Sequence, residues 1–132
     1  MIERLIIALA LLAIGCAVFM LYRRHHLRRI APTDPLLANL DLAIPTIVYF
    51  TTPTCLPCKT QQQPALHKLK EEMNGRLQIV QVDATQQPED AQRWGVQTAP
   101  TTFVLDPTGH AVAVNYGVAP LPLLKQQIRQ TA

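Results

Sequence analysis

The sequence predicts an α/β domain, with a mixed central sheet of about four strands flanked by helices, preceded by one N-terminal transmembrane helix. Three observations support this prediction. Residues 5–22 form a run without a charge, a strand-helix-strand pattern covers residues 46–82, and a hairpin pattern covers residues 101–116. After the apolar run, the 132-residue chain has room for one domain of about a hundred residues.

The first element is a helix long enough to cross a bilayer. Residues 5–22 read LIIALALLAIGCAVFMLY, and at about 1.5 Å per residue this run reaches roughly 27 Å as a helix, close to the thickness of a bilayer core. It has no polar face at helical spacing, which argues against a buried helix of a soluble protein. A cleaved signal peptide is the alternative, but Glu3 offsets Arg4 and the run ends in RRHHLRR rather than in small residues. We expect a retained anchor over residues 1–23 and a basic linker over residues 24–33.

Cys16 lies within this run. The segment from Leu12 to Cys16, LAIGC, loosely resembles a bacterial lipoprotein processing box, whose cysteine would become a lipidated N-terminus. Cleavage there would leave the apolar residues from Val18 to Leu21 near the start of the mature chain. The simpler interpretation of Cys16 is a small apolar residue of the anchor, and its lipidation stays open.

Charge is divided unevenly along the chain. Residues 1–31 carry five arginines against one glutamate, whereas residues 32–132 carry seven basic residues against eight acidic ones. The four arginines within residues 23–29 suit lipid headgroups, so we expect membrane lipid to contact residues 5–29. The domain itself has no excess of basic residues that would indicate binding to nucleic acid. The positive-inside rule favours the cytoplasmic side for the domain. The extracytoplasmic side stays open, because the context of a single span can override the rule.

The elements of the domain, residues 34–132, follow from local signals in chain order. Asp34 is placed to cap a short helix that Pro35 begins and that ends near Leu42. The run TIVYFT at Thr46–Thr51 is typical of a strand buried on both faces, and therefore central in the sheet. The remaining expected elements are a helix from Cys58 kinked at Pro64 and ended by Asn74-Gly75, strands at 77–82, 101–105 and 111–116, a short helix at 88–94, a turn at 106–109 and a helix at 122–130.

Cys55 and Cys58 follow the buried strand directly, in the sequence TCLPCK. A structural zinc site needs about four ligands. The domain otherwise offers only the scattered His67 and His110, so we expect no metal. A purely structural disulfide across so short a loop would remove little entropy from the unfolded chain. A redox pair has a physical basis, because the N–H groups and positive end of the following helix favour a thiolate at Cys55, and Cys58 lies one turn further on to resolve a mixed disulfide.

From Asp34 onward, the chain resembles the thioredoxin family. The residues that carry the resemblance are VYF at 48–50, CLPCK at 55–59, Pro64, IVQVD at 79–83, WGVQTAPT at 94–101 and Gly117. The resemblance implies a thioredoxin-like fold, catalytic roles for Cys55 and Cys58, and a cis peptide bond before Pro100. It also implies a substrate groove in which the backbone of Ala99 pairs with an extended peptide. Three further residues are expected in this groove: Thr54, Pro100 and Thr101.

The chain departs from the family at several positions. Thr54 and Leu56 flank the first cysteine where thioredoxins have tryptophan and glycine, and Tyr49 stands where they have a buried aspartate. That carboxylate helps to take the proton from the second cysteine, so its absence is expected to slow or reroute the resolving step. The family's first strand is also missing from the expected elements, because too few residues separate the apolar run from Thr46.

Several neighbouring side chains have ordinary interpretations. Trp94 and Tyr116 are interpreted as packing residues rather than substrate contacts. Lys59 is interpreted as a solvated residue of the first helical turn, whose charge modestly favours a thiolate. The run QQQ at residues 61–63 is too short to count as low-complexity sequence.

The sequence therefore predicts a membrane-anchored thiol-disulfide oxidoreductase of the protein-disulfide reductase type, with no metal or organic cofactor. Its expected partners are disulfide-containing protein substrates near the membrane, together with a reductase or membrane electron donor that restores the dithiol. The alternative is a non-catalytic thioredoxin-like binding or assembly module at the membrane. Retention of both cysteines argues against that alternative, and loss of the buried acid argues for it.

Overall fold

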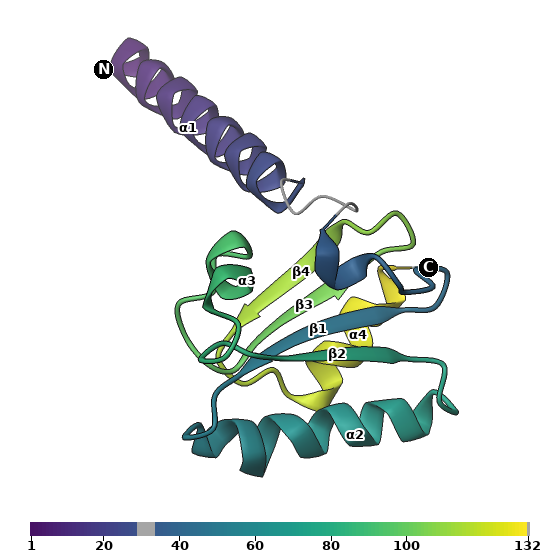
Figure 1. Cartoon of the computed structure of the whole chain (residues 1–132). Coiled ribbons are helices and arrows are strands. Elements are labelled where there is room, and N and C mark those ends of the chain that lie inside the picture. The colour runs from purple at the N-terminus through teal and green to yellow at the C-terminus, as the bar shows by residue number, and fades with distance from the viewer. Residues whose placement is uncertain (29–33, 132) are drawn as a thin grey trace.

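The computed structural model of the chain describes residues 1–28 and 34–131 and contains one long helix and one α/β domain (Figure 1). In chain order, the elements are α1 (Ile2–Arg28), the short helix η1 (Pro35–Leu37), β1 (Thr46–Thr51), the π-helix η2 (Cys58–Gln62), α2 (Gln63–Glu72), β2 (Gln78–Asp83), α3 (Pro88–Arg93), β3 (Thr101–Leu105), β4 (Ala111–Tyr116) and α4 (Leu121–Arg129). The predicted α/β class is confirmed.

The domain is built on a four-stranded mixed sheet in the order β2-β1-β3-β4. β1 pairs in parallel with β2 and antiparallel with β3, and β3 pairs antiparallel with β4. Every residue of β1 is buried, because the strand has neighbours on both sides and helices on both faces (Figure 1). The prediction of a buried central strand at Thr46–Thr51 is confirmed.

Alternate side chains of β1 lie on opposite faces of the sheet and belong to two cores. The first core holds Ile47, Tyr49, both cysteines of the pair, Leu66 and Leu69 of α2, and Leu124 and Ile128 of α4. The second core holds Val48, Phe50, Leu37 of η1, Ala91 of α3, Trp94 and Phe103. The rings of Phe50, Trp94 and Phe103 meet with centroid distances between 4.9 and 5.9 Å.

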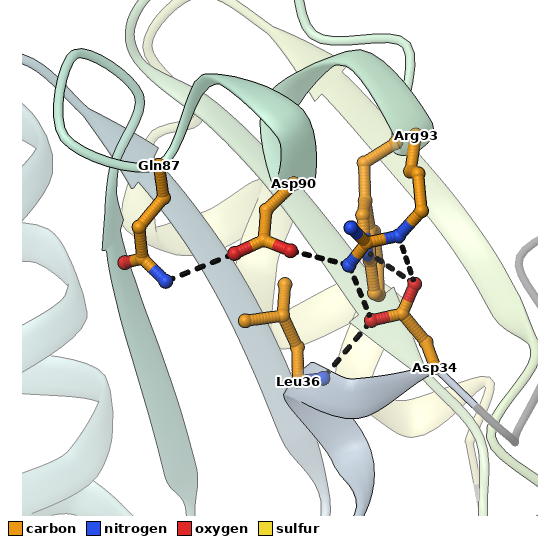
Figure 2. Close-up of polar contacts among 6 residues, drawn as sticks. Asp34, Leu36, Gln87, Asp90 and Arg93 are labelled. Atoms are coloured by element: carbon orange, nitrogen blue, oxygen red, sulfur yellow. Dashed lines mark hydrogen bonds and ion pairs between the residues drawn. The ribbon is translucent and has the colours of Figure 1, made fainter.

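Asp34 joins the start of the domain to α3 (Figure 2). Its carboxylate accepts hydrogen bonds from the Leu36 N–H at 3.0 Å, from Nε and Nη2 of Arg93 at 3.2 Å each, and from Nε1 of Trp94 at 3.1 Å. Arg93 also pairs with Asp90. The hydrogen bonds that Arg93 donates to Asp34 and Asp90 raise the pKa of its guanidinium group above the ordinary value. We call Asp34, Asp90, Arg93 and Trp94 the Asp34 cluster.

Two predictions about this part of the chain need correction. Asp34 caps a helix as expected, but that helix is a single 3₁₀ turn, Pro35–Leu37, and does not extend to Leu42. Trp94 is a packing residue as predicted, with 2% of its surface exposed. Tyr116 is not, because 64% of its surface is exposed at the end of β4.

The long helix α1 agrees with the predicted apolar element and ends at Arg28. Its segment Ile2–His25 is long and apolar enough to cross a membrane, and none of its most apolar window is buried. An N-terminal signal sequence would share these properties. Residues 24–28 of the expected linker belong to α1, and its other residues, 29–33, lie outside the described residues.

Candidate active site

Cys55 and Cys58 form a disulfide at the carboxyl end of β1, where the chain turns into η2 and α2. The two Cα atoms are 5.3 Å apart. The backbone N–H of Cys58, at the start of the helical segment, donates a hydrogen bond to Sγ of Cys55 at 3.2 Å. A helix N-terminus supplies unpaired donors and positive potential, so this contact is suited to stabilise a thiolate on Cys55 once the disulfide opens.

The two cysteines differ in access. Cys55 keeps 9% of its surface exposed, whereas Cys58 is fully buried among the residues of the first core. The surface that the pair exposes therefore belongs to Cys55, which is the residue that an incoming disulfide can approach. This asymmetry matches the order of events expected from the sequence, in which Cys55 attacks first.

The loop before β3 lies beside the pair because β3 runs antiparallel to β1, with Thr101 opposite Phe50. The peptide bond from Ala99 to Pro100 is cis, as the resemblance implied. The carbonyl of Pro100 accepts a hydrogen bond from the Gly117 N–H at 2.8 Å. The end of β4 and the loop that follows it are thereby tied to the cis-proline loop.

A recess of about 320 Å³ borders this loop. Its lining residues come from the segments that directly follow β1 and β2, from α3 and from the segment before Pro100, and they include Thr52, Pro88, Gln92, Thr98 and Ala99. Of the four groove residues expected from the sequence, only Ala99 lies in this lining. Thr54 is exposed, whereas Pro100 and Thr101 are buried, and the Thr101 hydroxyl donates to the Thr98 carbonyl at 2.7 Å.

Tyr49 stands where the resemblance implies an acid in the family, and it belongs to the first core together with both cysteines. The side chain is almost completely buried, and within residues 1–28 and 34–131 its hydroxyl has no hydrogen-bond partner. Tyr49 also lines an open pocket of about 570 Å³ on the α2 side, together with Lys59, His67 and Lys70. Lys59 is exposed, as predicted. In the part of the chain that the structure describes, no three His, Cys, Asp or Glu side chains are grouped so that they could hold a metal ion.

Gln62 is the functional candidate that the sequence interpretation missed. It belongs to the QQQ run, yet it is fully buried, and its side-chain amide bonds to the backbone of Ala119 through both its oxygen and its nitrogen. A signal for it exists in the sequence. Gln62 lies four residues after Cys58 and four before Leu66, so it occupies the buried face of the helix, where a polar side chain needs a partner.

A cysteine pair at the N-terminal end of a helix, beside a cis-proline loop, is the arrangement that thiol-disulfide oxidoreductases use to exchange disulfides with proteins. The fold and the site of this chain define that class. Comparison with known proteins agrees. Residues 37–130 match the thioredoxin family, and the chain belongs to this family.

Individual relatives support the same assignment. The chain is 35% identical to a thioredoxin of Bacillus subtilis over 81 residues, which cover 61% of this chain and 76% of that one. It is 33% identical to thioredoxin C-2 of Corynebacterium nephridii over 91 residues, covering 69% of this chain and 82% of that one. Among solved structures, mitochondrial thioredoxin 3 of Saccharomyces cerevisiae superimposes with a TM-score of 0.55 at 26% identity, over 64% of this chain and 76% of that one. The thioredoxin-like fold and the redox-active Cys55–Cys58 pair are thus confirmed.

Proposed function

We propose that the protein is a membrane-anchored reductase of protein disulfides. The observation that carries this proposal is the unequal environment of the two sulfurs. Cys55 is partly exposed and receives the Cys58 N–H, which suits an attacking thiolate, and Cys58 is buried next to it, which suits an internal resolving thiol.

The reaction consists of two exchanges. The Cys55 thiolate attacks one sulfur of a substrate disulfide, a Cys55–substrate disulfide forms, and the other substrate sulfur leaves as a thiolate. Cys58 then loses its proton and attacks Sγ of Cys55, which forms the Cys55–Cys58 disulfide and releases the second substrate thiolate. Two electrons pass from the cysteine pair to the substrate, and the two substrate thiolates take up protons.

The groove beside the pair holds the substrate during these exchanges. We assign the backbone of Ala99 to pair with an extended substrate segment, with Pro100 shaping the floor of the groove. Thr54, exposed before Cys55, contacts the substrate on the other side of the pair. Thr101 contributes through its backbone position at the start of β3, because its side chain is buried.

The helix α1 is the feature that supports a membrane location for this chemistry. Its apolar length supports a retained span. The apolar run and the arginines at its end support contact of residues 5–29 with membrane lipid, and these arginines also support a cytoplasmic domain. A cytoplasmic domain would be re-reduced by a thioredoxin-reductase-like donor, and an extracytoplasmic one by a membrane electron donor. Alkaline extraction of membranes and a C-terminal reporter active in one compartment test both points, and release of the chain by alkali would contradict the anchor.

A trapping experiment tests the reductase. In a Cys16→Ala background, which leaves only the pair, Cys58→Ser is expected to accumulate mixed disulfides in membranes, because the resolving thiol is gone. Cys55→Ser is the matched control and is expected to trap almost nothing, since Cys58 is buried. Equal trapping by both variants would contradict the assigned order.

The rival function is a binding module that uses the groove without turnover, which the replacement of the buried acid by Tyr49 favours. The unsubstituted chain is expected to reduce insulin disulfides in the presence of a dithiol donor, and Cys55→Ser is expected not to. Equal rates for the two proteins would favour the binding module.

A further inference from the structure

Gln62 links the helical segment that begins at Cys58 to the loop between β4 and α4, and the reaction needs these two segments at a fixed distance from each other. Its Nε2 donates to the carbonyl of Ala119 at 3.2 Å, and its Oε1 accepts from the N–H of Ala119 at 2.8 Å. We propose that Gln62 is a positioning residue for disulfide exchange, one that fixes the helix carrying Cys58 to the loop that supports Pro100. This proposal rests on the proposed reductase function.

On the helix side, Gln62 is joined to the cysteine pair through one turn of backbone. Cys58 begins the π-helix η2, and its carbonyl accepts the N–H of Gln63, which closes that turn. Cys58, Gln62 and Leu66 are all buried, so one continuous face of the helical segment lies against the core. π-helical turns are uncommon and occur frequently at functional sites, which agrees with a specific role for this one.

On the loop side, Gln62 holds the chain between β4 and α4. Ala119 is fully buried, in the same core as the cysteine pair. Two residues earlier, Gly117 donates its N–H to the Pro100 carbonyl at 2.8 Å, with a positive φ of 94° that suits glycine. The loop is therefore held at Pro100 by one hydrogen bond and at Gln62 by two, and these contacts connect Pro100 to Cys58.

An amide is suited to this position because the backbone of Ala119 presents both a donor and an acceptor in a buried core. An apolar side chain at residue 62 would leave both groups buried without partners. The loop would then move to recover hydrogen bonds, and Gly117 and Pro100 would move with it. Such a shift displaces a peptide paired with Ala99 relative to the Cys55 sulfur, and a displacement of about 1 Å can slow a reaction about 100-fold.

A comparison of two substrates separates positioning from general damage. Insulin must use the groove, whereas a nitrobenzoate disulfide dye needs only an accessible Cys55 thiolate. For the full 132-residue chain in detergent, we expect Gln62→Leu to lower the ratio of kcat/KM for insulin to kcat/KM for the dye by about tenfold or more. Gln61→Leu makes the same chemical change at an exposed neighbour and is expected to leave the ratio within about twofold of the original.

A conservative variant adds a pH signature. In Gln62→Glu, a protonated carboxyl group can accept from the Ala119 N–H and donate to its carbonyl, as the amide does, whereas the ionised form cannot donate. Burial raises the pKa of such an acid, so the substrate ratio is expected to be normal at low pH and to fall as the acid ionises. The same core also holds Tyr49 and the two cysteines. Because both substrates react with the same Cys55 thiolate, a change in the amount of that thiolate with pH affects both rates and cancels in the ratio.

The outcomes distinguish the two proposals. If the unsubstituted chain reduces neither substrate, the reductase function itself fails. If it reduces both, positioning by Gln62 is overturned by an unchanged ratio in Gln62→Leu, or by a proportional loss on both substrates. Should Gln62→Leu not fold, Gln62→Glu decides alone: a ratio that falls with pH supports the proposal, and a ratio independent of pH overturns it.

Discussion

The substitution Asp34→Ala tests whether the Asp34 cluster fastens the start of the domain. The carboxylate caps η1 through Leu36, and its loss from a helix cap costs about 1 kcal/mol. It is also the acceptor for Nε1 of Trp94, a residue that is 2% exposed, and an unpaired buried donor costs about 1–3 kcal/mol. The pair with Arg93 adds little, because Arg93 is exposed, so that water screens the pair, and because Arg93 keeps Asp90 as a partner.

Together these contributions predict a loss of about 3 kcal/mol in the free energy of unfolding. For a domain of about a hundred residues, this corresponds to a Tm lower by about 10–20 °C. Trp94 is the only tryptophan of the chain, so its fluorescence during a denaturant titration of the chain in detergent reports on the cluster directly.

Asp41→Ala is the matched control. Asp41 is exposed, and its carboxylate accepts one backbone N–H, that of Ala43 at 3.0 Å. We expect its replacement to cost less than about 1 kcal/mol. A difference of less than about 1 kcal/mol between Asp34→Ala and Asp41→Ala would refute the reasoning, because the buried indole donor would then not depend on Asp34.

Two further predictions concern Tyr49 and Asp106. Tyr49→Phe is expected to leave the free energy of unfolding unchanged or to raise it by up to about 1 kcal/mol, because the buried hydroxyl has no partner among the described residues, and a clear loss of stability would contradict this. For Asp106, burial raises the pKa, but hydrogen bonds from Thr108 and His110 outweigh it and hold the pKa below its ordinary value. A carboxyl group whose pKa is lower in the folded state stabilises the fold at pH values above its unfolded pKa of about 3.9. This stabilisation is lost as the pH falls through the pKa of the folded state. The stability advantage over Asp106→Asn should therefore shrink below about pH 4 in denaturant titrations, and a constant or widening gap would contradict this.

The features that were predictable from the sequence are those set by neighbours along the chain. The uninterrupted run at Thr46–Thr51 identified the central strand, and the pair after it, followed by a helix, identified the chemistry. Asp34 before Pro35 identified a cap, although the length of the helix could not be read from the cap alone.

The features that were missed depend on contacts between distant residues. Gln62 bonds to Ala119, which lies 57 positions later in the sequence, and nothing in the sequence around either residue indicates that the other is its partner. Asp34 meets Trp94 across 60 positions, so the packing of Trp94 was predictable but its hydrogen-bond partner was not. Tyr116 was misjudged because an aromatic residue at the end of a strand is buried only if another element covers it, and that coverage is a property of the assembled fold.

The order β2-β1-β3-β4 has a consequence for how copies of this protein meet. β2 ends the sheet, and in the described part of the chain no strand pairs with its outer side, so a row of backbone donors and acceptors is left along Gln78–Asp83. An open edge of this kind is a template for strand addition. The proposed membrane anchor would concentrate such domains in two dimensions and so raise the frequency of edge-to-edge encounters, at β2 and at the other edge strand, β4.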